Sequence, residues 1–378
     1  MKRSTDCILT THTGSLPRPP DLTTALLRRD KGEDANGELD ARIREGVMEV
    51  VRRQAEAGVT VVNDGEASKI SYVTYAKERL EGFGGESGPG GPHPDLEEFP
   101  DFARSREHGR AAAMPACIGP VSYGDREAVR TDLANLKAAL EQVDVVDAFM
   151  SAASPGVIST RLENMYYPDH EGYVAALADA MKVEYDEIHR AGIVLQLDCP
   201  DLAAGRYRYE SQAAFRRGVA LHVEAINHAT RDIPSEAMRL HLCWGNVEAP
   251  HTGDVPLADI IDLVFQARPA ALSFEAANPR HAHEWTLFKD VKLPAGKVLI
   301  PGVLDSTTNY VEHPELVAQR IVQYATLVGR ENVIAGSDCG FATFATAPSV
   351  YPTVTWAKLR AMADGARLAT THLWSRAA

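Results

Sequence analysis

The chain has 378 residues, enough for one large α/β barrel or two ordinary domains. Hydrophobic residues make up 45% and charged residues 24%, which is the mix of a soluble globular protein with a self-sufficient core. The formal net charge of −13 argues against nucleic acid and anionic membranes as partners, because both repel an acidic chain.

The N-terminal residues lack the apolar stretch of a secretory signal, and no apolar run approaches the length of a membrane span. The five cysteines form an odd and widely spaced set, which is typical of reduced thiols and not of a disulfide framework. We therefore expect a cytoplasmic protein. Its size and class suggest a homodimer.

Short apolar runs alternate with amphipathic segments along most of the chain. The strand candidates are 10–16, 59–66, 116–123, 147–155, 193–200, 239–246, 271–278, 297–305 and 332–340. The clearest helix candidates are 39–58, 173–192, 257–267 and 313–329. This alternation favours a single (β/α)8 TIM barrel over residues 1–378 rather than a doubly wound sheet. Since there are more strand candidates than barrel places, one of them must be an extra strand or an ordered loop.

The segment 82–102 is rich in Gly and Pro and interrupts the alternation. Such a composition is typical of a flexible surface insertion. A lid over the mouth of the barrel is the functional alternative.

Polar residues gather at the C-terminal ends of the apolar runs, where the active sites of (β/α)8 barrels lie. His241 and Cys243 are two residues apart on one strand, so both point to the same side. Cys339 and Glu275 also follow strand candidates. Imidazole, two thiolates and a carboxylate are a typical tetrahedral ligand set for Zn²⁺. The alternatives are a buried Cys beside a hydrogen-bonded core His, and an ion pair of Glu275 with Arg280 or Lys289.

Two thiolates and a carboxylate around Zn²⁺ give an electron-rich site that is poorly suited to activating water. It suits the binding and deprotonation of a thiol, whose sulfur stays nucleophilic. The carboxylate, Glu275, is the hardest of the ligands and so the natural one to yield to substrate sulfur. The sequence therefore indicates thiol alkylation, and no HExxH helix supports a peptidase.

Several ordered motifs resemble the catalytic barrel of cobalamin-independent methionine synthase, and also the epoxyalkane:coenzyme M transferases. They are TTHTGSLPRP, VVNDGE, GPVSYGD, LQLDCPDL, LHLCWGN, SFEAANPRHAHEW, PGVLDSTTNYVEHPE and GSDCGF, and they run along nearly the whole chain. The resemblance implies a barrel of the uroporphyrinogen decarboxylase/methionine synthase type and a catalytic zinc. It places the zinc ligands at His241, Cys243, Glu275 and Cys339.

The resemblance also implies that Ser15, Glu66 and Asp198 bind the amino-acid part of homocysteine, although Glu66 and Asp198 could instead form structural ion pairs. The family's pterin-stacking Trp has no counterpart here. Tyr123 is the nearest aromatic residue to its place, and we take it as a candidate substrate-binding residue.

Asn246 is a further candidate for substrate binding, because loops after barrel strands commonly line the mouth. The family's proton-handling His, which follows the GVxD strand, is replaced within residues 305–308. Asp305 is our candidate catalytic residue there.

The sequence thus predicts a zinc-dependent S-methyltransferase or alkyltransferase of methionine biosynthesis, with homocysteine or a related thiol as acceptor. A folate, a corrinoid or a small methylated compound could be the donor. One alternative is the opening of an epoxide by coenzyme M, whose sulfonate would need a cation such as Arg18 or Arg280. The other is a zinc-binding barrel without turnover.

Overall fold

The structure is a computed structural model that describes residues 1–33, 38–85, 87, 97–105, 114–345 and 350–375. Parallel strands form one curled seven-stranded sheet, in the order β1-β4-β5-β6-β7-β8-β9. They are β1 (Val61–Val62), β4 (Asp147–Ala153), β5 (Val194–Asp198), β6 (Met238–Leu242), β7 (Ala271–Phe274), β8 (Val298–Leu304) and β9 (Gly336–Ser337). The chain is therefore an α/β fold, and all these strands end at the same edge of the sheet.

The N-terminal segment lies between the first and last strands of this sheet. The Leu9 carbonyl accepts a hydrogen bond from the Ala335 amide, and the Thr11 amide donates to the Ala335 carbonyl at 2.8 Å. On its other side, the Thr10 carbonyl accepts from the Val61 amide at 2.9 Å. Residues 9–11 thus connect the two edges of the seven-stranded sheet.

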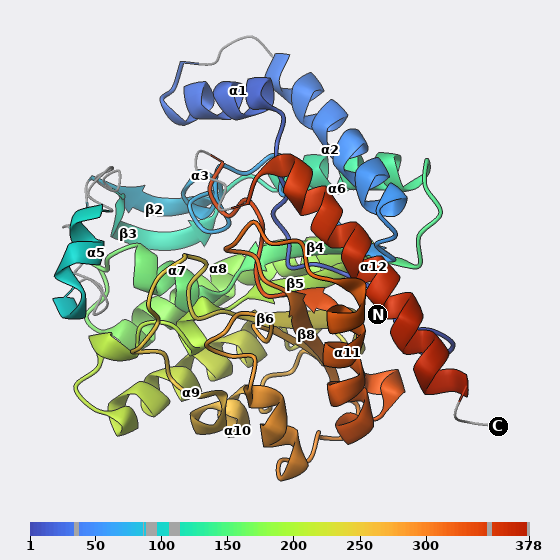
Figure 1. Ribbon diagram of the computed structural model, residues 1–378. Helices are drawn as coiled ribbons and strands as arrows, with labels where there is room; N and C mark the ends of the chain where they lie inside the picture. The colour runs from blue at the N-terminus through green and yellow to red at the C-terminus, as the bar shows by residue number, and fades with distance from the viewer. Residues whose placement is uncertain (34–37, 86, 88–96, 106–113, 346–349, 376–378) are drawn as a thin grey trace.

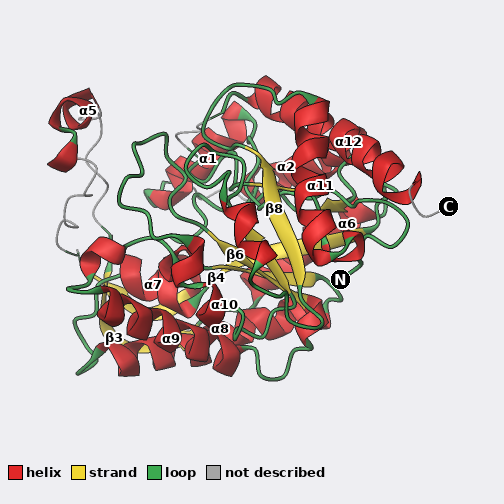
Figure 2. Cartoon of the chain, turned by 60° about the horizontal axis from the view of Figure 1, so that its bottom comes forward, coloured by secondary structure: helices red, strands yellow, loops and turns green. Residues whose placement is uncertain are grey.

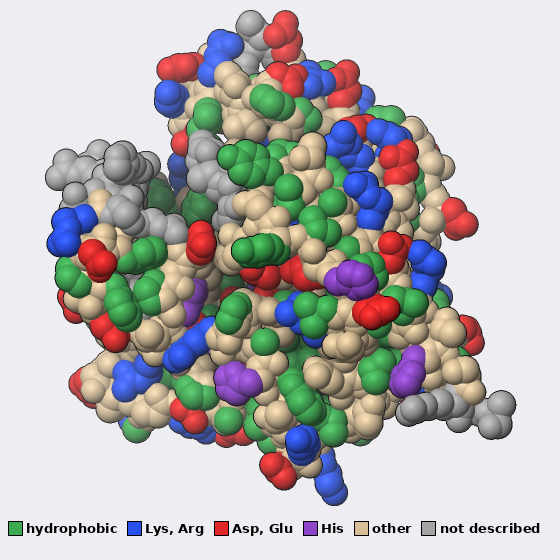
Figure 3. Space-filling model, viewed as in Figure 1, with side chains coloured by type: hydrophobic (Ala, Val, Ile, Leu, Met, Phe, Trp, Pro, Cys, Tyr) green, Lys and Arg blue, Asp and Glu red, His purple; other side chains and the backbone are tan. Residues whose placement is uncertain are grey.

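Helices surround the sheet (Figures 1 and 2). They are α1 (Pro20–Asp30), α2 (Glu38–Glu56), α3 (Ala76–Arg79), α5 (Pro100–Ser105), α6 (Glu127–Leu140), α7 (Pro155–Arg161), α8 (His170–Arg190), α9 (Gln212–Ala229), α10 (Ile261–Val264), α11 (Pro314–Val328) and α12 (Pro352–Ser375). Helix α2 packs against α6, α8 against α9, and α11 against α12. None of the described helices combines the length and the apolar character needed to cross a membrane. Acidic and basic side chains are interspersed over the face shown in Figure 3.

The extra strand among the sequence candidates is β3 (Ala116–Tyr123). It does not join the seven-stranded sheet but pairs antiparallel with β2 (Leu80–Gly84) in a separate two-stranded sheet. The predicted insertion at 82–102 therefore begins within β2 and ends in α5, and most of the residues between them lie outside the described part of the chain.

Two apolar clusters hold the fold together. The larger one packs the helices against the sheet. The smaller one gathers residues from separate strands and from the N-terminal segment: Leu9, Val61, Phe149, Val194, Ala271, Val298, Ile300 and Ile334. Where the other strands contribute an apolar residue, strand β6 contributes Arg239. Its guanidinium lies 3.9 Å from the centre of the Phe149 ring and donates hydrogen bonds to the Thr11 hydroxyl and the His12 carbonyl. The interior of the curled sheet is thus filled, so the space for a ligand is at the ends of the strands.

Candidate metal centre and substrate cavity

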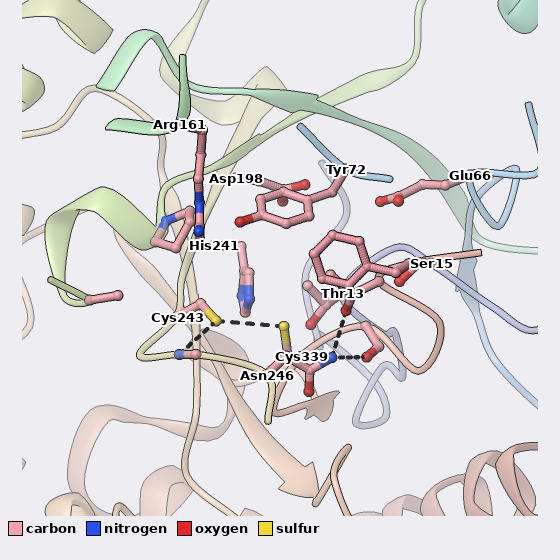
Figure 4. A pocket seen from close by; sticks show the side chains of 16 residues that line it. Thr13, Ser15, Glu66, Tyr72, Arg161, Asp198, His241, Cys243, Asn246 and Cys339 are labelled. Atoms are coloured by element: carbon pink, nitrogen blue, oxygen red, sulfur yellow. Dashed lines mark hydrogen bonds between the residues drawn. The ribbon is translucent and has the colours of Figure 1, made fainter. Parts of the chain in front are cut away.

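A cavity with an empty volume of about 630 Å³ opens at the C-terminal ends of the parallel strands. It is lined by Thr13, Ser15, Glu66, Tyr72, Arg161, Asp198, Pro200, Ala204, His241, Cys243, Gly245, Asn246, Cys339, Gly340, Thr343 and Phe344 (Figure 4). Most of the strand-end residues that the sequence predicted for the site therefore share one cavity.

Three of the predicted zinc ligands meet in this cavity. His241 and Cys243 come from β6 and its end, and Cys339 follows β9. Their ligand atoms all lie within 4.8 Å of one another, and the Cys243 and Cys339 sulfur atoms are 3.7 Å apart. No other group of three or more His, Cys, Asp or Glu side chains in the described residues is arranged to hold a metal ion.

The imidazole of His241 is prepared to act as a ligand. Burial lowers the pKa of His241 to about 3, so its ring is neutral, which is the form that binds metals. Its Nδ1 lies 3.3 Å from the Ser273 hydroxyl, while its buried Nε2 has no hydrogen-bond partner among the residues that the structure describes. A proton on Nδ1 and a free Nε2 lone pair are the usual arrangement of a metal-binding His.

The residues fit a zinc ion. Two sulfur atoms at about 2.3 Å from a tetrahedral zinc lie about 3.8 Å apart, close to the observed spacing of Cys243 and Cys339. The hydrogen bond to Cys339 and burial raise the pKa of the Cys243 thiol well above its usual range. In the protein alone the Cys243 thiol therefore keeps its proton, which a divalent cation would displace.

Glu275, the fourth predicted ligand, lies beside this cluster but is not one of its three members. It follows β7, and one carboxylate oxygen accepts from the Trp244 amide at 2.8 Å. The other accepts from the Asn278 side chain at 2.8 Å. Burial raises the pKa of Glu275 well above its usual range, and the nearby Cys243 adds to this effect.

The alternative reading of Glu275 as half of an ion pair is not supported. Arg280 donates to the Thr252 carbonyl, and Lys289 lies 4.9 Å from the centre of the Trp285 ring. In the described part of the chain neither cation forms a salt bridge with Glu275.

The turn after β7 is tied to the neighbouring strand end through Asp338. One Asp338 oxygen accepts from the Ala276 and Ala277 amides at 2.8 and 2.7 Å, and the other accepts from the Asn278 amide at 2.7 Å. Asn278 in turn holds Glu275. The position of the Glu275 carboxylate is therefore set by the residue that precedes Cys339.

A second group of polar residues, the acidic pair Glu66 and Asp198, lines the cavity wall. Glu66 accepts from the Ser151 hydroxyl at 2.8 Å, and Asp198 accepts from the Gln196 side chain at 2.7 Å. Burial, together with the charge of Glu66, raises the pKa of Asp198 to about 8. Among the described residues neither carboxylate has a salt-bridge partner, so the structural ion pair that we considered for them is absent.

The backbone at Glu66 is also unusual. Its φ is 55°, a left-handed conformation that residues other than glycine rarely adopt. The Arg18 guanidinium donates to the Glu66 carbonyl at 2.8 Å and so helps to hold this conformation. Strained backbone of this kind is concentrated at functional sites, where the surrounding structure fixes a side chain in place.

The other predicted site residues divide into two groups. Ser15 and Asn246 line the cavity, and Asn246 is held by hydrogen bonds to Gly340 and Thr343. Tyr123 and Asp305 do not line it.

The Tyr123 hydroxyl donates to the Glu184 carboxylate at 2.7 Å, and so joins the two-stranded sheet to α8. Asp305 accepts from the amide and hydroxyl of Thr307 and from the Thr308 hydroxyl, and so stabilises the turn after β8. The substrate role predicted for Tyr123 and the catalytic role predicted for Asp305 thus have no support from their positions.

The cations that we expected near the mouth are also elsewhere. Arg18 is buried and bonded to the Glu66 and Ala342 carbonyls, and Arg280 donates to Thr252; neither lines the cavity. The cation in the lining is Arg161, the last residue of α7, and Tyr72 lies beside it. Sequence reasoning missed both because neither follows a strand of the sheet.

Comparison with known proteins connects this geometry to a family. Residues 8–88 and 160–367 match the family described as cobalamin-independent synthase, catalytic domain. The chain is similar to the methionine synthase of Saccharolobus solfataricus, with 24% identity over 96% of this chain and 95% of that protein. It is also 24% identical to the methionine synthase of Pyrococcus furiosus, over 86% of this chain and 84% of that protein.

Solved structures show the same fold. The B12-independent methionine synthase from Shewanella sp. W3-18-1, in complex with selenomethionine, superimposes with a TM-score of 0.77 and 19% identity. That match covers 98% of this chain and 99% of the other. A protein from Listeria monocytogenes, described as a putative vitamin-B12 independent methionine synthase, gives a TM-score of 0.67 over 95% of this chain and 98% of that one, also with 19% identity.

Proposed function

This chain belongs to the family of cobalamin-independent methionine synthase catalytic domains, and we propose that it transfers a methyl group to the thiol of homocysteine or a close relative. The observation that carries the proposal is the convergence of His241, Cys243 and Cys339 on the floor of one cavity. The acidic pair in the wall of the same cavity supports an acceptor that also carries an ammonium group.

The proposal includes the metal. His241, Cys243 and Cys339 would hold zinc, and Glu275 would be the ligand that substrate sulfur replaces. A zinc ion held there would lower the pKa of an acceptor thiol and keep its sulfur nucleophilic near neutral pH. Glu275 is suited to bind the metal reversibly, because hydrogen bonds from the Trp244 amide and the Asn278 side chain already hold its carboxylate beside the three other residues.

The residues of the chain itself would position the acceptor. Glu66 and Asp198 would bind the α-ammonium, which would relieve the repulsion between these two buried carboxylates. Ser15 and Asn246 would offer hydrogen bonds on the remaining sides. The acceptor thiol loses its proton, its sulfur bonds to the methyl carbon of the donor, and the bond from that carbon to the donor breaks.

We also propose that the sheet closes as a (β/α)8 barrel, in which residues 9–11 supply the remaining strand. The hydrogen bonds of this segment to both edges of the sheet support closure. On this view residues 1–378 form a single catalytic domain that works in the cytoplasm, where its thiols stay reduced.

A second candidate, alkylation of coenzyme M by an epoxide, is supported by one feature, the cation Arg161 in the cavity lining. A sulfonate acceptor would need such a cation but would make no use of the acidic pair. Homocysteine uses both charges, so it is the acceptor that we favour.

Isothermal titration of the zinc-loaded protein with L-homocysteine, in buffers of different ionisation enthalpy, tests the proposal. We expect release of about one proton per thiol bound at neutral pH. Mass spectrometry should then detect methionine when a donor panel of methylfolates, methylcorrinoids and small methylated compounds is supplied. Neither proton release nor methionine formation would occur if the site did not activate thiols.

A further inference from the structure

The lining of the cavity carries both carboxyl groups and a cation. Figure 4 shows Glu66 and Ser15 on one side and Arg161 on the other, with Tyr72 between them and the sulfur atoms of Cys243 and Cys339 below. Glu66 is buried, whereas Arg161 is exposed at the mouth, as the last residue of α7. Among the described lining residues Arg161 is the one Lys or Arg side chain.

Arg161 is poorly neutralised by its surroundings. The groups that contribute most to raising the pKa of Arg161 are the Tyr72 and Tyr207 phenols and the Cys243 thiol, and none of them is a carboxylate. Within the described ranges no Asp or Glu forms a salt bridge with it. It hydrogen bonds to Tyr72, and burial raises the pKa of that phenol to about 12, so Tyr72 is uncharged at neutral pH. A guanidinium carries five N–H donors in a fork, and one phenol oxygen leaves most of them free.

The other cations near the cavity are already used by the protein. The Lys69 ammonium donates to the Ser151 carbonyl at 2.6 Å, and Arg18 donates to the Glu66 and Ala342 carbonyls. Neither lines the cavity. Within the described part of the chain, an anionic group that enters this space can therefore reach a full positive charge only at Arg161.

An anionic acceptor needs that charge. The cavity lining already contains the carboxyl groups of Glu66 and Asp198, in a chain of net charge −13, so a further carboxylate or sulfonate would be repelled without a cation. Ser15 offers a single neutral hydroxyl, whereas guanidinium matches two oxygen atoms at once. We propose that Arg161 binds the anionic group of the acceptor thiol, and so makes the site selective for thiols that carry a carboxylate or sulfonate.

This inference rests on the proposed function, because it concerns the tail of the same acceptor. It adds a cation for the acceptor's carboxylate, to which Ser15 and Asn246 offer only uncharged hydrogen-bond donors. It differs from a purely structural role, in which Arg161 would only stabilise the C-terminal end of α7 and orient Tyr72.

The test compares three thiols on the zinc-loaded protein by isothermal titration. L-homocysteine carries a carboxylate and an ammonium, 2-mercaptoethanesulfonate carries only a sulfonate, and 2-aminoethanethiol carries only an ammonium. The variants are Arg161→Met, Ser15→Ala and, as a matched control, Arg280→Met, since Arg280 is exposed and lies outside the cavity lining.

In Arg161→Met we expect both anionic thiols to bind about 10- to 100-fold more weakly, which is the range for the loss of hydrogen bonds between charged partners. The affinity for 2-aminoethanethiol should stay within about twofold of the parent value. Ser15→Ala and Arg280→Met should not reproduce this pattern. Comparison of L-homocysteine with 2-mercaptoethanesulfonate shows whether the site prefers a carboxylate or a sulfonate.

Unchanged affinity for both anionic thiols in Arg161→Met would overturn the inference. An equal loss of affinity for all three thiols would also overturn it, because that result indicates a structural role for Arg161. In both cases the parent protein still binds 2-aminoethanethiol with proton release, and the proposed function stands. If the parent protein binds none of the thiols, the proposed function fails and the inference fails with it.

Discussion

The sulfur atoms of Cys243 and Cys339 lie 3.7 Å apart, although 96 residues separate the two cysteines in the chain. The curled sheet brings them together, because β6 and β9 both end at the edge where the cavity opens. Both thiols are free and buried. With the His241 Nε2, which has no hydrogen-bond partner among the described residues, they form a group of three side chains that could hold a divalent cation.

The acidic pair should recognise the ammonium group of the acceptor. We expect Glu66→Gln and Asp198→Asn each to weaken binding of L-homocysteine about tenfold or more, because each removes a charged hydrogen-bond acceptor. Binding of 3-mercaptopropionate, which has no ammonium, should be unchanged or stronger, since a negative charge is removed. Isothermal titration of the zinc-loaded variants measures both affinities, with the exposed Glu210→Gln as control. Equal weakening of both thiols would contradict an ammonium-binding role.

Tyr123 should stabilise the fold and leave substrate binding unaffected. Its hydroxyl donates to the buried Glu184 carboxylate, so Tyr123→Phe should lower the free energy of unfolding by about 2 kcal/mol. Chemical denaturation gives this value, and Tyr310→Phe, at a side chain 83% exposed, serves as control. Homocysteine affinity should equal that of the parent. A variant of normal stability that binds homocysteine tenfold more weakly would restore the substrate role.

Asp338 should be needed for the position of Glu275. In Asp338→Asn one oxygen becomes an NH2 group, which faces backbone N–H groups of residues 276–278 and cannot accept from them. We expect a loss of about 3 kcal/mol in the free energy of unfolding and weaker zinc binding. Denaturation and competition with a zinc chelator measure these two effects. If the free energy of unfolding and the zinc affinity of Asp338→Asn equal those of the parent and of the exposed control Asp290→Asn, Asp338 does not determine the conformation of this turn.

His12 should make stability depend on pH. Burial lowers the pKa of His12 to about 4 in the folded protein, against 6.5 for an ordinary His. Because the unfolded chain binds the proton more tightly, this contribution to stability is complete above pH 6.5 and is lost as the pH falls to about 4. The loss is about 3 kcal/mol.

The test is the difference in the free energy of unfolding between the parent and His12→Gln, measured with zinc-free protein from pH 4 to pH 7. His12 contacts Gln54 and Phe149, away from the three ligands, so zinc does not enter the comparison. We expect the parent to lose more stability than the variant as the pH falls. Parallel curves would mean that His12 titrates as an exposed His does.

The sequence predicted the parts of the site that follow strand ends. A buried parallel strand appears in the sequence as an uninterrupted apolar run, and the C-terminal ends of such strands meet at one edge of the sheet. The sequence alone therefore predicted that Glu66, Asp198, His241 and Cys339 share one cavity. The same rule also selected Asp305, which follows a strand end but stabilises its own turn and does not line the cavity. Hydrogen-bond geometry, which sequence periodicity does not contain, separates these two roles.

The remaining errors come from long-range pairing. The strand β3 has the pattern of a barrel strand, yet it pairs antiparallel with β2, so Tyr123 lies away from the cavity. Arg161 and Tyr72 belong to a helix end and a loop, and only the tertiary packing brings them to the mouth. Nothing in the local sequence distinguishes Arg161 from a surface arginine.

The most direct test of the account is zinc K-edge X-ray absorption of the zinc-loaded protein before and after addition of L-selenohomocysteine. We expect two sulfur atoms at about 2.3 Å and nitrogen or oxygen neighbours at about 2.0 Å, with a zinc–selenium signal appearing on addition. Cys243→Ser together with Cys339→Ser should abolish zinc binding, whereas Cys7→Ser, at an exposed cysteine, should not. A zinc shell without sulfur, or a spectrum that selenohomocysteine leaves unchanged, would contradict the central claim.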